Sequence, residues 1–201
     1  MPCIEEQTHL SIKNILLAIA PSDSSEATLP DAIGLARRYG STMFVADVIS
    51  PEAICEIVRN RQVDLLVIGT HGQTLANNTG STTEEILRMV PCPVLIIGPR
   101  VTHTELAKGG LERIVYVTEF STSSLDTLLY AAALAQDNGA QLALVHVAEE
   151  TTMGPFYYGN SKSIVFRKRL ESLVPARSGF LSEFVIGEGD RVEGLLSSQR
   201  T

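Results

Sequence analysis

The sequence repeats itself at a fixed distance of 99 residues. The segment from Ile15 to Val48 aligns without a gap with the segment that begins at Ile114, and eleven of the 34 aligned positions are identical. The identities include turn serines, the inner face of a helical pattern and the glycine that follows it, Gly40 and Gly139. An internal duplication of this kind restricts the fold to one that two copies of the same small unit can each adopt.

The repeated unit reads as strand, helix, strand. Residues 15–19 form a short apolar run, and residues 29–36 carry apolar side chains at helical spacing. Gly40 follows where a helix ends in a left-handed residue, and a second apolar run covers residues 43–49. Two strands joined through a helix pair in parallel, with a right-handed crossover. The sequence therefore predicts an α/β fold, a Rossmann-like open parallel sheet flanked by helices, with the first strand of each copy central and buried, 114–117 in the second copy.

After this shared part the two copies differ. The first continues with a helical pattern after Pro51, a strand at 63–68, a glycine-bearing loop at 69–81, a helix at 82–89 and a strand at 94–97. The second passes through a polar, aromatic loop at 151–163 to a helix at 166–173, a strand at 181–186 and the start of a helix at Val192. We expect an N-terminal tail at 1–13, a first copy at 14–98, a linker at 99–111 and a second, C-terminally incomplete copy at 112–201.

The glycine-bearing loop has the chemistry of a phosphate site. A buried parallel strand ends at Gly69 and Gly72, and ligands bind beyond the carboxyl ends of such strands. Gly80, Ser81 and Thr82 then open a helix, whose free N–H groups favour an anion. The structural alternative for Ser81 is an ordinary capping box with Glu84.

Three segments together resemble the universal stress protein family: DLLVIGTHG at 64–72, PCPVLII at 91–97 and ILLA at 15–18. The resemblance covers nearly the whole chain and implies a five-stranded parallel sheet, dimers formed through the last strand and, in some members, ATP binding. Transferred by position, it implies phosphate contacts and a set of residues near the ribose and base. The phosphate contacts are Gly69, Gly72, Gly80, Ser81 and the backbone N–H of Thr82, and the second set is Val48, Ile68 and His71.

The chain also departs from the nucleotide-binding pattern of that family. The spacer at 73–79 is seven residues long, shorter than in binding members, and contains no Lys or Arg. Ala20 stands where binding members have an Asp at the end of the first strand, and Glu119 is its counterpart in the second copy. The first copy lacks a middle helix and strand, and the second lacks the glycine loop. Two functions stay open: a stress-response regulatory protein that binds an adenine nucleotide through its first copy, or a nucleotide-free protein that uses the fold to dimerise.

Composition excludes several other classes. Sixteen Lys and Arg against 23 Asp and Glu argue against a nucleic-acid partner. No apolar run is long enough for a membrane span, and the acidic N-terminus does not resemble a signal peptide, so we expect a cytoplasmic protein. The apolar strand at 94–97, expected at a sheet edge, predicts a homodimer.

Catalytic chemistry is not evident in the sequence. It contains no GxxxxGK[ST] motif and no GxSxG motif, and no carboxylate accompanies the glycine loop to serve as general base or metal ligand. The four histidines have no metal-site spacing, and the three cysteines read as reduced thiols. We therefore expect no enzymatic activity, no catalytic residue and no metal.

Overall fold

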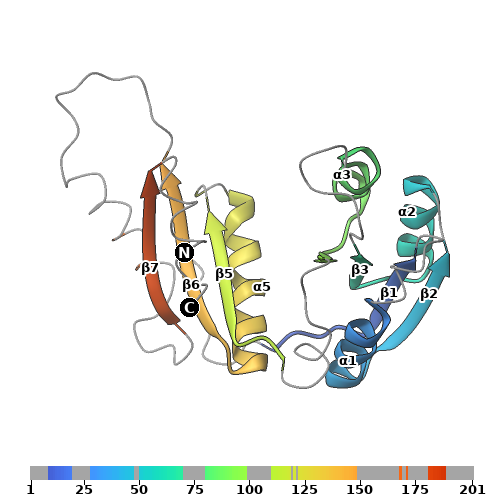
Figure 1. The fold of residues 1–201 in the computed structure, drawn as a ribbon, viewed down its shortest axis with the longest axis horizontal. Helices are drawn as coiled ribbons and strands as arrows, with labels where there is room; N and C mark the ends of the chain where they lie inside the picture. Colours follow the sequence, from blue (N-terminus) through green and yellow to red (C-terminus); the bar gives the residue numbers. More distant parts are fainter. Residues whose placement is uncertain are drawn as a thin grey trace. The chain divides into compact units, whose positions relative to one another are not determined.

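The chain forms two compact units. A computed structural model describes residues 9–19, 28–47, 50–69, 80–98, 110–118, 120, 122–148, 168, 171 and 181–188. Residues 11–110 make up the first unit, and residues 1–10 together with 111–201 make up the second. Both contain parallel strands and helices, and in the first unit these alternate along the chain (Figure 1).

The first unit has a four-stranded sheet in the order β2-β1-β3-β4, and every pair of neighbouring strands is parallel. Its elements are β1 (Asn14–Ile19), α1 (Leu29–Tyr39), β2 (Thr42–Asp47), α2 (Pro51–Asn60), β3 (Leu65–Gly69), α3 (Gly80–Met89) and β4 (Val94–Ile97). The predicted parallel α/β fold with an inner first strand is therefore confirmed for this copy.

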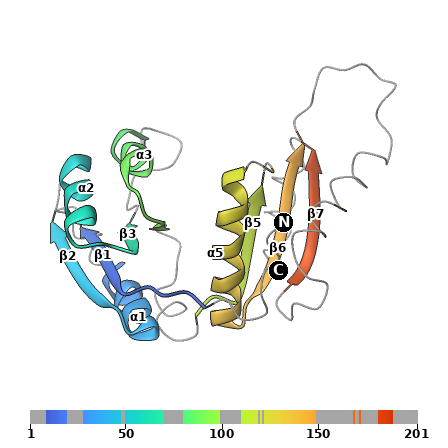
Figure 2. The same ribbon diagram turned by 180° about the vertical axis from the view of Figure 1, so that it is seen from behind.

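β1 is buried because both of its edges and both of its faces are covered. Ile15, Leu16 and Leu17 have no exposed surface. Leu16 packs with apolar residues of α2 and α3 in one core cluster, and Ile15 and Leu17 point to the opposite face, where α1 contacts β1. Side chains alternate between the faces of a strand, so complete burial of three consecutive residues requires cover on both sides. Figure 2 shows the helices of this unit from behind.

A single carboxylate aligns the starts of β1 and β3. The Oδ2 atom of Asp64 accepts hydrogen bonds from the backbone N–H groups of Lys13 and Asn14, each 2.9 Å long. The backbone N–H of Asp64 donates in turn to the carbonyl oxygen of Asn14, also at 2.9 Å. Hydrogen bonds to a charged acceptor are the stronger ones, so Asp64 fixes where the two strands begin to pair.

The second unit has a three-stranded parallel sheet in the order β5-β6-β7 within the residues that the structure describes. Its elements are β5 (Arg113–Thr118), α5 (Thr122–Asn138), β6 (Gln141–Ala148) and β7 (Leu181–Glu188). α5 packs against β5 and β6, and the core lies between them, with Leu128, Leu142 and Leu144 buried (Figure 1).

The expectation of a central, buried first strand is wrong for this second copy. β6 is the middle strand and β5 lies at the edge. Val115 and Val117 are 47% and 61% exposed, while Tyr116 between them is buried against α5. In the first unit β3 covers the second edge of β1, and no described strand of the second unit does the same for β5.

The repeat seen in the sequence recurs in backbone geometry. Ile15 pairs with Met43 in the first unit, and Ile114 pairs with Leu142 in the second, so the strand registers are the same after the shift of 99 residues. Both helices also end alike. Gly40 has φ 64° and Gly139 has φ 61°. The next residue donates its N–H back into the helix at 2.8 Å in both cases, Ser41 to Ala36 and Ala140 to Ala135.

Some expected elements fall outside the described residues. These are the loop at 151–163, the helix beginning at Val192 and the linker up to 109. Of the helix expected at 166–173, Lys168 and Glu171 are described, and both are helical.

The two matched glycines provide a test of the repeated cap. Nothing lies within 4 Å of a Cβ added to Gly40 or Gly139, so replacement by Ala should cost only the backbone strain of a left-handed residue. We expect Gly40→Ala and Gly139→Ala each to lower the free energy of unfolding by about 1 kcal/mol. Urea unfolding, with hydrogen exchange to report on each unit, measures the loss. Asn tolerates this conformation better, so the Asn variants should lose less, and an equal loss for Ala and Asn would contradict the explanation.

Candidate functional site

The carboxyl edge of the first sheet includes the end of β3, and α3 is the next element along the chain. β3 ends at Gly69, which pairs with Ile97 of β4. On the other side of β3, Ile68 pairs with Ala18 near the end of β1. α3 begins at Gly80, after the segment that follows β3. In parallel sheets this edge is where ligands bind.

The predicted nucleotide contacts fall into two groups. Ile68, Gly69 and the backbone of α3 from Gly80 through Ser81 and Thr82 are described. Val48, His71 and Gly72 lie outside the described residues, as do Ala20, Glu119 and the spacer at 73–79. Ile68 is buried in the core cluster with Leu16 and Ile86, so its side chain serves the packing of the unit.

The start of α3 supplies backbone donors. The first N–H groups of an α-helix have no acceptor within the helix, and α3 is ten residues long with no acidic residue in its first turn. Its positive end is therefore not neutralised by a side chain of its own. Gly69 belongs to a strand and Gly80 to a helix, so neither needs a left-handed backbone. What glycine contributes at both positions is the absence of a side chain at the sheet edge.

The capping-box interpretation of Ser81 and Glu84 is wrong. α3 already includes Gly80, which places Ser81 inside the first turn and not before it. The Oε1 atom of Glu84 instead accepts a hydrogen bond from Nη2 of Arg88 at 2.6 Å, one turn further along the helix. Glu84 thus pairs along the exposed face of α3.

The second unit has a different set of residues at its carboxyl edge. The Nδ1 atom of His146, at the end of β6, lies 2.7 Å from the carbonyl oxygen of Thr118, at the end of β5. A carbonyl only accepts, so Nδ1 carries the proton and donates. The backbone N–H of Phe120 donates to Oγ1 of Thr118 at 2.9 Å. The rings of Phe120 and His146 pack with centroids 4.5 Å apart.

This cluster is structural. Thr118 and His146 are both buried, and the aromatic contact covers the imidazole. Phe120 has φ 64°, an uncommon conformation for a bulky residue, and its hydrogen bond and ring contact hold it there. These contacts identify His146 as a structural residue with a satisfied Nδ1 atom.

Neither the cysteines nor the acidic residues form a reactive centre in the described part of the chain. Cys55 is a buried free thiol, and Cys92 is a partly buried one. Burial raises the pKa of the Cys92 thiol, and the nearby Asp64 carboxylate raises it further, which disfavours the reactive thiolate. Among the described residues no group of three or more His, Cys, Asp and Glu side chains could hold a metal ion.

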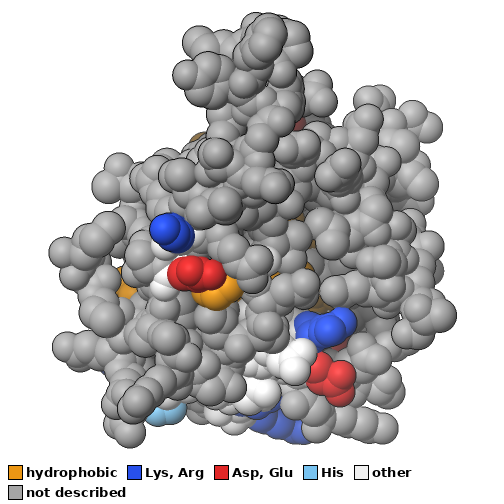
Figure 3. Space-filling model, turned by 90° about the vertical axis from the view of Figure 1, so that its left-hand side faces the viewer, with side chains coloured by type: hydrophobic (Ala, Val, Ile, Leu, Met, Phe, Trp, Pro, Cys, Tyr) orange, Lys and Arg blue, Asp and Glu red, His pale blue; other side chains and the backbone are white. Residues whose placement is uncertain are grey.

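On the face drawn in Figure 3, both basic and acidic side chains are visible among the described residues. No helix in the described ranges is long and apolar enough to cross a membrane.

Sequence reasoning missed two carboxylates that organise the backbone. The sequence analysis places Asp64 within the strand expected at 63–68 and assigns no role to Asp137. His9, which was expected in an N-terminal tail, lies with its Nδ1 atom 2.6 Å from Oδ1 of Asp137 in α5. An Asp in the last turn of a helix is unfavourable and could have served as the signal for Asp137.

Comparison with known proteins agrees on one family. The model of the universal stress protein family matches residues 51–98 and 110–178. Comparison with the curated proteins gives no match.

Solved structures give the same result for the fold. A universal stress protein from Archaeoglobus fulgidus superposes with a TM-score of 0.64 at 14% identity, covering 98% of this chain and 82% of that one. A protein from Pseudomonas aeruginosa, proposed to be a universal stress protein, gives 0.57 at 15% identity, covering 94% and 79%. Since the family match spans more than half of the sequence and these structures share the fold, the chain belongs to the universal stress protein family.

Proposed function

We propose that the protein is a cytoplasmic regulatory protein of the stress response, and that its first unit binds ATP or another adenine nucleotide as a signal. The carboxyl edge of the first sheet carries this proposal. There the strand that ends at Gly69 is followed by a ten-residue helix that begins at Gly80. Backbone N–H groups at a helix start, together with glycines that leave room for a ligand, suit a phosphate group.

The nucleotide is proposed as a ligand and not as a substrate. Transfer of a phosphoryl group needs a bound cation or a positioned base, and the described residues near the loop contain no cluster of metal-binding side chains. A protein that holds ATP without hydrolysing it reports the nucleotide level through its own conformation or partners.

Binding of one nucleotide per chain is expected. The edge of the second unit is occupied by Thr118, Phe120 and His146, whose polar groups already bond to one another. The rings of Phe120 and His146 also pack against each other there. The second copy also lacks the glycine-rich sequence of the first.

A second candidate is a nucleotide-free protein that uses the fold to dimerise. It is favoured by β4, which lies at the edge of its sheet with Ile96 41% exposed. An apolar edge strand offers unpaired backbone groups to another strand. The short spacer without Lys or Arg and the Ala at position 20 support the same candidate.

Replacement of Gly80 tests the nucleotide site. Val at the start of α3 places a branched side chain where the phosphate would approach, so Gly80→Val should abolish ATP binding in titration calorimetry. Ser81→Ala should weaken binding by about 1 kcal/mol, because it removes one hydroxyl and leaves the backbone donors. Equal affinities of wild type and Gly80→Val, or no binding by wild type, would favour the second candidate.

Gly40→Ala is the matched control for this experiment. It removes a glycine from the same unit and strains the end of α1, which does not take part in the proposed site. Its ATP affinity should equal that of wild type. A similar loss in Gly40→Ala and Gly80→Val would assign the effect to lowered stability of the unit.

The structural role of His146 can be tested in the same way. His146→Ala leaves the buried carbonyl oxygen of Thr118 without this donor and removes the ring contact with Phe120. We expect a loss of about 2 kcal/mol in the free energy of unfolding of the second unit, with one ATP still bound per chain. Val117→Ala, at an exposed position of β5, should change stability by less than about 0.5 kcal/mol. Loss of nucleotide binding in His146→Ala would place the ligand in the second unit.

Association through β4 has its own test. Ile96→Lys places a charge on the exposed side of the edge strand, a substitution that disfavours strand pairing. If β4 forms the dimer contact, light scattering should show a dimer for wild type and a monomer for Ile96→Lys. Val45→Lys, at an exposed position of the opposite edge strand β2, is the control and should stay dimeric. A monomeric wild type would remove dimerisation from the proposal.

A further inference from the structure

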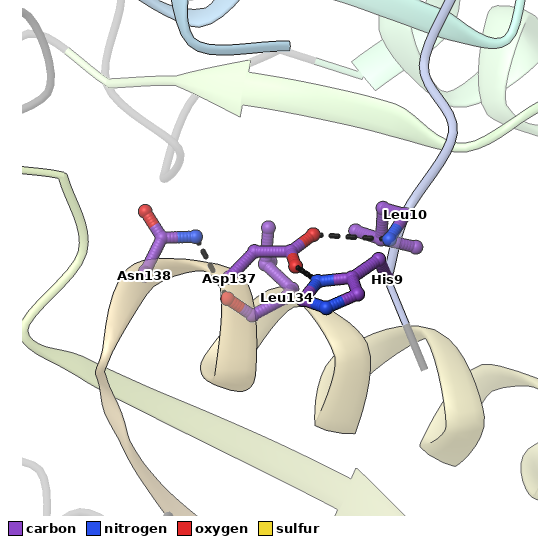
Figure 4. Close-up of polar contacts among 5 residues, drawn as sticks. All are labelled: His9, Leu10, Leu134, Asp137 and Asn138. Carbon is purple, nitrogen blue, oxygen red and sulfur yellow. Dashed lines mark hydrogen bonds and ion pairs between the residues drawn. The ribbon is translucent and has the colours of Figure 1, made fainter. Parts of the chain in front are cut away.

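Asp137 holds the N-terminal segment through both of its carboxylate oxygens. Oδ1 lies 2.6 Å from Nδ1 of His9, and Oδ2 accepts a hydrogen bond from the backbone N–H of Leu10 at 3.0 Å. An ionised carboxylate only accepts, so His9 donates from Nδ1. Figure 4 shows the Asp137 side chain directed from the end of α5 toward these two residues.

The negative charge of Asp137 does not stabilise α5 at the position where it lies. A negative charge in the last turn of an α-helix is repelled by the negative end of the helix dipole. At the corresponding place in the first copy stands Arg38, and the last turn of α1 contains Arg37 as well. The last turn of α5 contains no basic residue. The carboxylate is therefore stabilised by the two donors of the N-terminal segment, and its side chain is only 10% exposed.

Asn138, next to Asp137, binds the chain at the point where it returns from the first unit to the second. The side chain of Asn138 accepts from the backbone N–H of Leu111 at 3.2 Å and donates to the carbonyl oxygen of Leu134 at 2.7 Å. The chain passes from the second unit to the first after Leu10, and returns to the second unit at Leu111. Two adjacent side chains at the end of α5, Asp137 and Asn138, thus bind the chain where it leaves the second unit and where it returns to it.

We propose that His9 and Leu10 form a strap. Their hydrogen bonds to Asp137 attach the N-terminal segment to α5, so that this segment is a structural part of the second unit. With the strap closed, His9 and Leu10 are held on α5 of their own unit, immediately before the chain passes into the first unit. With the strap open, the hydrogen bond between Leu111 and Asn138 remains. The strap is a conformational device, independent of whether the first unit binds a nucleotide.

Amide hydrogen exchange of the full chain, followed residue by residue with NMR, tests the strap. In wild type the Leu10 amide should exchange slowly because it donates to Asp137. Asp137→Ala should speed its exchange about tenfold or more, the loss expected for a hydrogen bond to a charged acceptor. His9→Ala should speed it only about twofold, because the imidazole is 69% exposed and a pair of this kind contributes little.

Three further variants separate the strap from general effects. Asp137→Asn keeps one side-chain oxygen as acceptor and should give an intermediate rate at Leu10. Asn138→Ala should speed exchange at Leu111 and leave Leu10 slow. Glu84→Gln, which removes an exposed carboxylate of the first unit, should change neither.

The outcomes are distinct. Protection of the buried β6 amides in every variant shows that the second unit is folded, so that a change at Leu10 reports the strap alone. If the β6 amides of Asp137→Ala lose that protection, the second unit of this variant is not folded. The exchange rates of the Leu10 amide in Asp137→Asn and His9→Ala then test the strap. A Leu10 amide that exchanges equally fast in wild type, Asp137→Asn and His9→Ala would overturn the proposal.

Discussion

The first unit depends on the pairing of one strand. β1 lies between β2 and β3, in parallel with both, and its three central residues are completely buried. Because every backbone N–H and C=O of such a strand needs a partner, the positions of β2 and β3 follow from it. Asp64 sets the start of the β1–β3 pair through two hydrogen bonds to the backbone of Lys13 and Asn14. The sheet edge at Gly69 and the helix that begins at Gly80 are built on this frame.

The second unit shows what happens when the same strand loses one neighbour. β5 keeps the register of β1 toward the strand that follows it, and its helix ends on the same left-handed glycine. The valines that would be buried on the far side of a central strand are exposed instead. Local sequence therefore determines the strand, the helix and their joint, whereas burial depends on what the rest of the copy supplies.

Much of the fold was predictable from the sequence because the relevant signals are local. Apolar runs, helical spacing and Gly40 with Gly139 predicted the strands, helices and caps, and the motifs from Asp64 to Ile97 predicted the family. The edge position of β5 was not predictable, because it depends on which other strands pair with it, and β6 is its one partner among the described residues. Contacts of Asp137 with His9 and Leu10 join residues more than 120 positions apart, which periodicity cannot detect. At the candidate site, the first residue of α3 was not predictable: the helix already includes Gly80 and Ser81, because helix starts are set by backbone geometry.

The contacts of Asp137 also bear on how this protein evolved. The second unit is discontinuous in the sequence, because residues 1–10 precede the first unit and residues 111–201 follow it. Duplication of the repeated unit does not by itself account for a segment that lies in front of one copy and belongs to the unit of the other. Recombination that transferred residues 111–201 to another protein would leave His9 and Leu10 behind, and Asp137 would lose these two hydrogen-bond partners. The second unit therefore keeps these contacts only when its two separate sequence segments are inherited together.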